Sequence, residues 1–127
     1  MKKNILIISF ILLLSCSGIG KERLTSNFYL TKIDYADSEL SLSFRLQETG
    51  DFIGVVPPKV IGVGFDKNFI IAKQQQRDKI NFYIIPLKDK IHHSPDENKI
   101  GPLSKKEFIL QRKIFGVPDS LFFRTLN

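Results

Sequence analysis

The stretch that decides the fold is residues 60–87, VIGVGFDKNFIIAKQQQRDKINFYIIPL. It contains three apolar runs, at 60–65, 69–74 and 80–87. Two polar turn sequences, Asp66-Lys67-Asn68 and Arg77-Asp78-Lys79, separate the runs, and Asn68 can adopt a positive φ. Short β-branched and aromatic runs joined by tight turns indicate consecutive antiparallel strands. These residues therefore predict a three-stranded meander.

Details of this stretch refine the prediction. Ile84 and Ile85 are consecutive, which indicates a strand buried on both faces, and Pro86 ends it or marks an edge. The glycines of Gly62-Val63-Gly64 favour a bulge or close packing. They do not begin a dinucleotide-binding loop, because Lys67 stands where its third glycine belongs. Gln74-Gln75-Gln76 allows two interpretations, an exposed edge that receives a partner strand or, preferred, a solvated strand end.

An upstream hairpin is predicted from residues 28–35 and 40–47. In the second segment, apolar and polar residues alternate, which is the pattern of a half-buried strand. The apolar positions are Leu40, Leu42, Phe44 and Leu46. In the first segment, one face carries Tyr29, Thr31, Ile33 and Tyr35.

The periodicity changes after residue 101. Residues 88–101 form a predicted polar loop, and Ser104 and Glu107 form a capping box for a helix over residues 105–115. Gly116 is placed to cap its C-terminus, and residues 121–125 predict a closing strand. The fold class is therefore mainly β with one C-terminal helix (α+β): an antiparallel meander sheet of five to six strands, with helix 105–115 packed on it. Residues 27–127 form a predicted single domain, and most of the 11 Phe are expected to pack in its core, since the chain has no Trp.

The N-terminal segment reads as a targeting signal. Lys2 and Lys3 precede an apolar stretch over residues 5–14 that is too short to span a bilayer, which is typical of a secretory signal peptide. The stretch ends at Leu13-Leu14-Ser15-Cys16, and Cys16 is the only cysteine. This sequence resembles the lipobox of bacterial lipoproteins.

That resemblance implies removal of residues 1–15 and lipidation of Cys16 with diacylglyceryl and acyl chains such as palmitate. Residues 16–26 would be the lipidated cysteine and a tether. The protein would then face the periplasm from a membrane of the cell envelope, with the outer membrane favoured because Ser17 is not Asp. Loss of Lys2 and Lys3 lowers the net charge from +6 to +4, which gives no reason to expect a nucleic-acid partner.

Few residues suggest chemistry. The candidate binding loop contains His92, His93, Asp96 and Glu97. Adjacent histidines diverge and lack the spacing of a metal motif, so we expect no metal and no cofactor. The sequence contains no motif of a nucleophilic or metal-dependent hydrolase, and we therefore assign no catalytic residue. The basic helix residues Lys105, Lys106, Arg112 and Lys113 are interpreted as a solvated face.

Residues 60–125 are also similar to a family of small, uncharacterised bacterial lipoproteins. The similar stretches are residues 60–66, residues 69–74 and Gly101-Pro102-Leu103-Ser104. The family implies no activity. We therefore expect a non-enzymatic binding or structural module, anchored to the membrane through the lipid on Cys16, with an envelope protein as a candidate partner. Two alternatives are an immunity-type inhibitor of an exported toxin and a small envelope hydrolase that uses His92 or His93.

Overall fold

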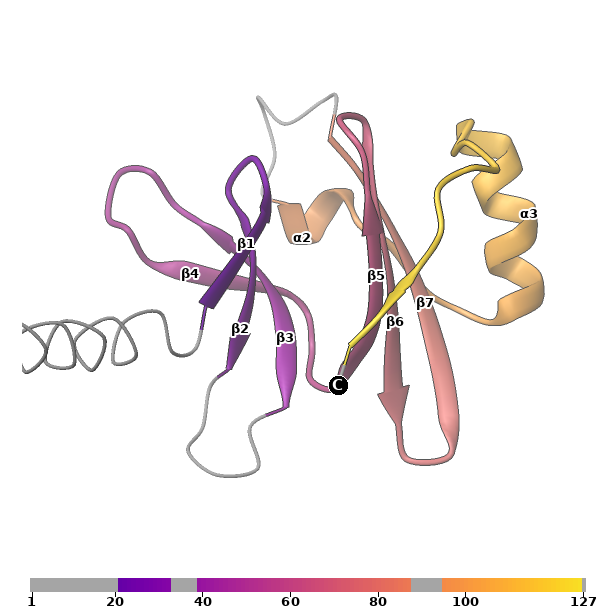
Figure 1. Cartoon of the computed structure of the whole chain (residues 1–127), viewed down its shortest axis with the longest axis horizontal. Coiled ribbons are helices and arrows are strands. Elements are labelled where there is room, and N and C mark those ends of the chain that lie inside the picture. The colour runs from indigo at the N-terminus through magenta and orange to yellow at the C-terminus, as the bar shows by residue number, and fades with distance from the viewer. Residues whose placement is uncertain (1–20, 33–38, 88–94, 127) are drawn as a thin grey trace, which may run out of the picture.

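The computed structural model describes residues 21–32, 39–87 and 95–126 (Figure 1). This part of the chain folds into two antiparallel sheets and two helices. The first sheet has the order β1-β2-β3-β4, formed by Lys21–Thr25, Phe28–Lys32, Leu40–Arg45 and Phe52–Val56. The second has the order β8-β7-β6-β5-β9, formed by Ile100–Leu103, Lys79–Pro86, Phe69–Gln76, Val60–Phe65 and Arg124–Thr125. The helices are α2, Pro95–Asn98, and α3, Lys105–Phe115.

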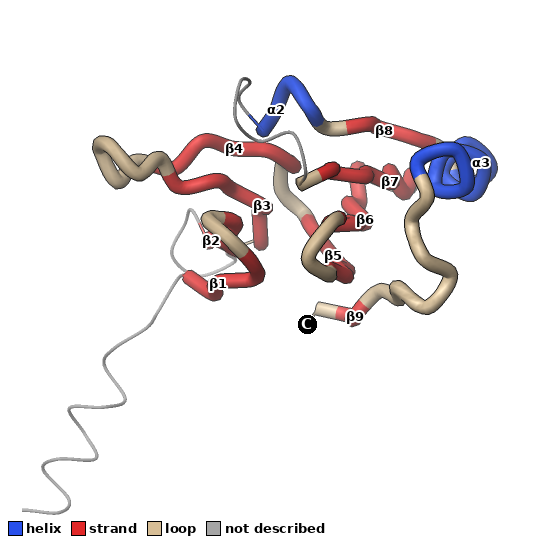
Figure 2. The backbone as a smooth tube through the Cα atoms, turned by 90° about the horizontal axis from the view of Figure 1, so that it is seen from above, coloured by secondary structure: helices blue, strands red, loops and turns tan. Residues whose placement is uncertain are grey.

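The elements form three layers. The first sheet packs face to face with the second sheet, and α3 covers the opposite face of the second sheet, as the view from above shows (Figure 2). The predicted fold class, mainly β with one C-terminal helix on a sheet, is therefore confirmed. The strands, however, are divided between two sheets and do not form one meander. Pro57 and Pro58, which have no N–H to extend a strand ladder, lie in the link between β4 and β5 where the chain changes sheet.

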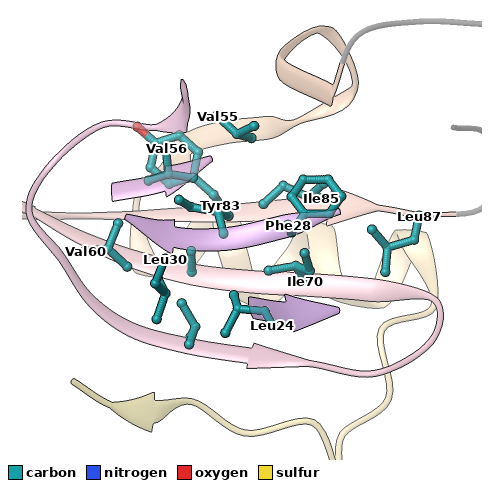
Figure 3. Packing of buried hydrophobic residues seen from close by; sticks show 13 residues of the cluster. Leu24, Phe28, Leu30, Val55, Val56, Val60, Ile70, Tyr83, Ile85 and Leu87 are labelled. Atoms are coloured by element: carbon teal, nitrogen blue, oxygen red, sulfur yellow. The ribbon is translucent and has the colours of Figure 1, made fainter. Parts of the chain in front are cut away.

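The main core lies between the two sheets (Figure 3). Leu30 and Leu42 are paired across β2 and β3, and both are almost fully buried. From the second sheet, Ile70 and Ile85 face them. A second cluster lies between the second sheet and α3 and contains Ile84. The expectation that consecutive Ile84 and Ile85 are buried on opposite faces is thus confirmed, because the second sheet lies between two apolar layers at this point.

The local signals of α3 are confirmed in detail. The Ser104 side chain accepts a hydrogen bond from the Glu107 backbone N–H at 3.2 Å, and the Glu107 carboxylate accepts one from the Ser104 N–H at 2.9 Å. Gly116 ends the helix in the left-handed conformation, with φ of 76°. The three strands of the predicted meander are likewise present as β5, β6 and β7.

Several boundaries differ from the predictions. Residues 21–25, which were assigned to the tether, form β1, and the Leu24 side chain is buried in the main core. The predicted loop 88–101 contains α2 and the start of β8, which pairs with β7. The closing strand is shorter than predicted, since only Arg124–Thr125 pair with β5. Ile33 and Tyr35 of the predicted hairpin lie outside the described residues.

Of the two interpretations of Gln74-Gln75-Gln76, the exposed edge is wrong, and the solvated strand end holds for Gln76, which is exposed at the end of β6, but not for Gln74. All three glutamines belong to β6, an interior strand, and pair with Asn81, Ile80 and Lys79 of β7. Gln74 is buried, and its polar atoms have partners there. Its amide donates to the Pro58 carbonyl at 2.8 Å, and its Oε1 accepts from the Asn81 amide at 2.9 Å. The Gln75 N–H donates to the Lys59 carbonyl at 2.8 Å, so this stretch offers no free edge to a partner strand.

The turns of the meander also differ in one respect. Asn68 does not have a positive φ; the Asp66 carboxylate instead accepts from the N–H groups of Asn68 and Phe69, each at 2.8 Å. Arg77, in the next turn, adopts the positive φ, of 60°. Neither helix in the described part of the chain has the length and apolar character needed to cross a lipid bilayer.

Candidate ligand-binding groove

The predicted binding loop lies only partly within the described residues, and its role stays a prediction. His92 and His93 lie outside the described residues, as do the predicted lipobox residues Leu13, Leu14, Ser15 and Cys16. Asp96 and Glu97 lie in α2, which contacts β4 and β7. Within residues 21–32, 39–87 and 95–126, no cluster of three or more His, Cys, Asp or Glu side chains could hold a metal ion.

A groove of about 780 Å³ lies between α3 and the second sheet, a size typical of small-molecule sites. Its floor is formed by three strands of the sheet, and α3 forms one wall. The segment that leads into β9 contributes Phe123 on the other side. The full lining is Ile61, Lys73, Lys79, Ile80, Phe82, Ser104, Lys105, Phe108, Ile109, Arg112 and Phe123.

Strand periodicity explains the floor. Side chains at alternate positions point to one face of a sheet, so Lys73 of β6 shares a face with Phe69 and Ile71, which belong to the cluster under α3. On β7 the same alternation places Ile80 and Phe82 on this face. Lys73 is thus a charged residue at the end of an otherwise apolar row.

The position of the second wall depends on a glycine. At Gly64 of β5, an added Cβ would lie 2.2 Å from the Phe122 carbonyl oxygen, so only glycine permits the C-terminal segment to pass this closely. The segment is then fixed by two strand pairs, Gly62 with Thr125 and Val63 with Arg124. The expectation that these glycines permit close packing and a bulge is confirmed, because the register of β5 also shifts between Val60 and Gly62.

Three phenylalanine rings line the groove. The rings of Phe82 and Phe108 stack with their centres 4.9 Å apart, and Phe123 lies 5.6 Å from Phe108. Phe108 is buried and Phe123 is half-buried, so the Phe108 ring joins the helix to the sheet and the Phe123 ring closes the side. Ile80 and Ile109 add exposed apolar surface at the opening. Such surface is available to the apolar part of a ligand.

Lys73 places a positive charge among these rings. Its Nζ lies 4.6 Å from the centre of the Phe123 ring and 5.9 Å from that of Phe82, which is cation–π geometry. Among the described residues, no carboxylate lies within ion-pair distance of this ammonium, and the ion pair between Arg124 and Glu22 lies elsewhere. The half-buried ammonium is therefore open to an anionic group.

The other cations of the groove differ in their structural roles. Arg112 stacks its guanidinium on Phe108 and donates to the carbonyls of Pro118 and Leu121 at 2.7 and 3.0 Å, so it holds the C-terminal segment against α3. Lys79 and Lys105 are exposed at the end near the start of α3. Glu107 stands beside this end. Its bonds to Ser104 lower its pKa, with a smaller contribution from Lys79.

The lining therefore combines four cations with aromatic and aliphatic side chains and contains no acidic residue. This arrangement can bind a molecule with an anionic group and an apolar body, because it supplies ammonium donors and ring faces together. A smaller hollow of about 180 Å³ on the first sheet is lined by Asn27, Tyr29, Arg45, Leu46 and Gln47. It offers one cation and little apolar surface.

The groove was not predicted from the sequence: Lys105 and Arg112 were interpreted as part of a solvated helix face, and Lys73 was assigned no role. The one local signal is Lys73 itself. Positions 69, 71 and 73 lie on one face of a strand, and Lys73 is charged whereas Phe69 and Ile71 are apolar. The pairing of Lys73 with Phe123, fifty residues later, has no local signal.

Comparison with known proteins identifies a family. No curated protein and no solved structure shows significant similarity to the chain. One family model, described as "Protein of unknown function (DUF3997)", matches residues 25–127, a range that includes all strands from β2 to β9, α3 and every residue of the groove. The chain therefore belongs to this family of unknown function.

Proposed function

We propose that the protein is a lipid-anchored envelope lipoprotein that acts as a non-enzymatic binding module, and that the groove beneath α3 is its binding site. The observation that carries the binding role is the lining of the groove, with its four cations, three phenylalanine rings and no acidic side chain. A site that binds without chemistry needs such complementary surface and no activated nucleophile or base.

The arrangement of the layers supports a role in presentation. β1 is an edge strand of the first sheet, and α3 covers the face of the second sheet that points away from the first sheet (Figure 2). If Cys16 carries the lipid, the chain leads from the membrane anchor into the domain at β1, and the groove would face away from the anchoring membrane. The link would be short, because five residue steps from Cys16 to Lys21 span at most about 18 Å.

Anchoring is tested by metabolic labelling with a palmitate analogue. We expect the wild-type protein to carry the label and to sediment with membranes, and the Cys16→Ala variant to lose the label. Labelling that survives this substitution would refute lipidation at Cys16.

Binding is tested by photo-crosslinking in cells that express the full-length protein. A benzophenone amino acid replaces either Ile109, which lines the groove, or Ile114, which lies on the same helix, is 65% exposed and lies outside the groove. We expect adducts from position 109 that are absent from position 114 and are reduced by Lys73→Met. Equal adducts from both positions, or none from either, would show that the groove is not the binding face.

A further inference from the structure

The groove combines cationic and apolar side chains, and this combination indicates the class of ligand that it binds. We propose that its ligand is a small amphiphilic anion, in which a carboxylate or phosphate is joined to an apolar chain or ring. This inference rests on the proposed function, because it names the ligand class of the same groove.

Charge complementarity carries the first step. Lys73, Lys79, Lys105 and Arg112 all line the groove, and no acidic side chain does. Glu107 stands next to Lys79, but both of its described hydrogen-bonding roles are in the helix cap with Ser104. Four cations around one opening attract an anion and repel a cation.

The position of Lys73 carries the second step. Its ammonium is half-buried, lies over the Phe123 ring and has no carboxylate partner among the described residues. An ammonium in this setting gains more from an anionic ligand than an exposed lysine does, because less water screens the pair. An anionic group that reached Lys73 would place the rest of the molecule against Phe82 and Phe108.

The size and position of the groove carry the third step. A volume of about 780 Å³ lies within the range of small-molecule sites. The groove lies on the face of the second sheet that points away from the first sheet, to which β1 belongs, so a lipid anchor joined to the domain at β1 would hold the groove away from the anchoring bilayer. We therefore infer a free amphiphile as the ligand, in preference to a lipid within that bilayer.

The test uses the full-length protein reconstituted in phosphatidylcholine nanodiscs, with empty nanodiscs as the baseline. The probes are 2-naphthoate, 2-naphthylmethylammonium and acetate. Their binding is measured by calorimetry and by the shifts of the methyl NMR signals of isoleucine. We expect saturable, one-to-one binding of naphthoate that shifts the signals of Ile80 and Ile109 more than that of Ile114. The ammonium probe and acetate should bind at least tenfold more weakly, which is about 1.4 kcal/mol.

Two pairs of variants place the probe. Lys73→Met removes the charge and keeps the apolar stem, and should weaken naphthoate binding tenfold or more. Lys67→Met, in the turn between β5 and β6, should leave binding unchanged. Ile109→Glu adds an anion to the groove wall and should abolish binding, whereas Ile114→Glu, outside the groove, should not. None of these four side chains is buried, so each variant should fold, and thermal melting can confirm that it does.

Several results would overturn the inference. They are equal binding of the cationic and anionic probes, or naphthoate binding that is unaffected by Lys73→Met and Ile109→Glu. Dimers that Ile109→Glu dissociates would identify a second copy as the occupant, and shifts of Ile109 caused by phosphatidylglycerol nanodiscs alone would identify the bilayer.

If naphthoate does not bind while the crosslinks from position 109 persist, the proposed binding role stands and the ligand is a protein segment. If naphthoate binds but position 109 gives no crosslinks, the groove accepts anions without the proposed role in cells.

Discussion

The side-chain amide of Asn81 donates a 2.9 Å hydrogen bond to Oε1 of Gln74, on the face of β6 and β7 that packs against the first sheet. Both residues are almost fully buried, and the Gln74 amide also donates to the Pro58 carbonyl. This polar pair therefore connects the second sheet to the link between the two sheets. Buried polar groups are costly when one partner is removed, because the remaining group is left without a hydrogen bond.

We predict that Gln74→Ala lowers the free energy of unfolding by about 1–3 kcal/mol, because it leaves the Asn81 amide and the Pro58 carbonyl with fewer partners. Urea denaturation followed by circular dichroism measures this change. Gln75→Ala, on the opposite face of the same strand, is the control and should stay within roughly 0.5 kcal/mol of wild type. Equal losses in the two variants would contradict the role assigned to the buried pair.

Gly64→Ala should displace the C-terminal segment from β5. The new Cβ would meet the Phe122 carbonyl at 2.2 Å, and backbone cannot yield as a side-chain end can. We expect a loss of roughly 1–3 kcal/mol of stability. We also expect faster hydrogen exchange at the Leu126 N–H, which donates to the Ile61 carbonyl at 2.9 Å.

The matched control for that prediction is Gly54→Ala. Gly54 lies in β4, where an added Cβ has no atom within 4 Å, so the substitution should be neutral or slightly stabilising. Unchanged exchange at Leu126 in Gly64→Ala would mean that the segment is not held by its approach to β5.

Ser104→Ala should weaken the start of α3. It removes the hydroxyl that accepts from the Glu107 N–H, and loss of such a cap typically costs about 1 kcal/mol. Because α3 forms one wall of the groove, crosslinking from position 109 should fall as well. Ser104→Asp restores an acceptor at the N-cap and should recover stability; a failure to recover would indicate that Ser104 acts by something other than capping.

The cap also predicts a pH dependence. The hydrogen bonds from Ser104, and secondarily Lys79, lower the pKa of Glu107 in the folded state. A lowered pKa means that the carboxylate contributes stability above its unfolded-state pKa, and that this contribution is lost as the pH falls through the folded-state pKa. The stability difference between wild type and Glu107→Gln should therefore be largest near neutral pH and shrink below about pH 4.

Chemical denaturation across this pH range measures the difference. The same comparison made in a Ser104→Ala background is the control: it removes the side-chain hydrogen bond, the second cause of the lowered pKa, and keeps the backbone N–H of residue 104, the first cause, so the difference should shrink without vanishing. A difference between wild type and Glu107→Gln that grows on acidification would have the wrong sign and would contradict the assignment.

Much of the fold was predictable because its signals are local. The capping box of Ser104 and Glu107, the left-handed Gly116 and the turn at Asp66 each depend on residues within a few positions of one another. The alternation of Leu40, Leu42 and Phe44 likewise specified the inner face of β3, where Leu42 pairs with Leu30 and Phe44 with Phe28.

The sequence by itself determined the meander of residues 60–87, the helix over residues 105–115 and the mainly β class, because turns, caps and periodicity depend on local backbone preferences. Only the tertiary structure decided that the strands divide into two sheets, that Gln74 is buried and that Lys73 meets Phe123 above the second sheet. These features join residues distant in the chain, and they depend on which apolar faces are buried against each other. The groove, its cations and its aromatic lining arise from that choice.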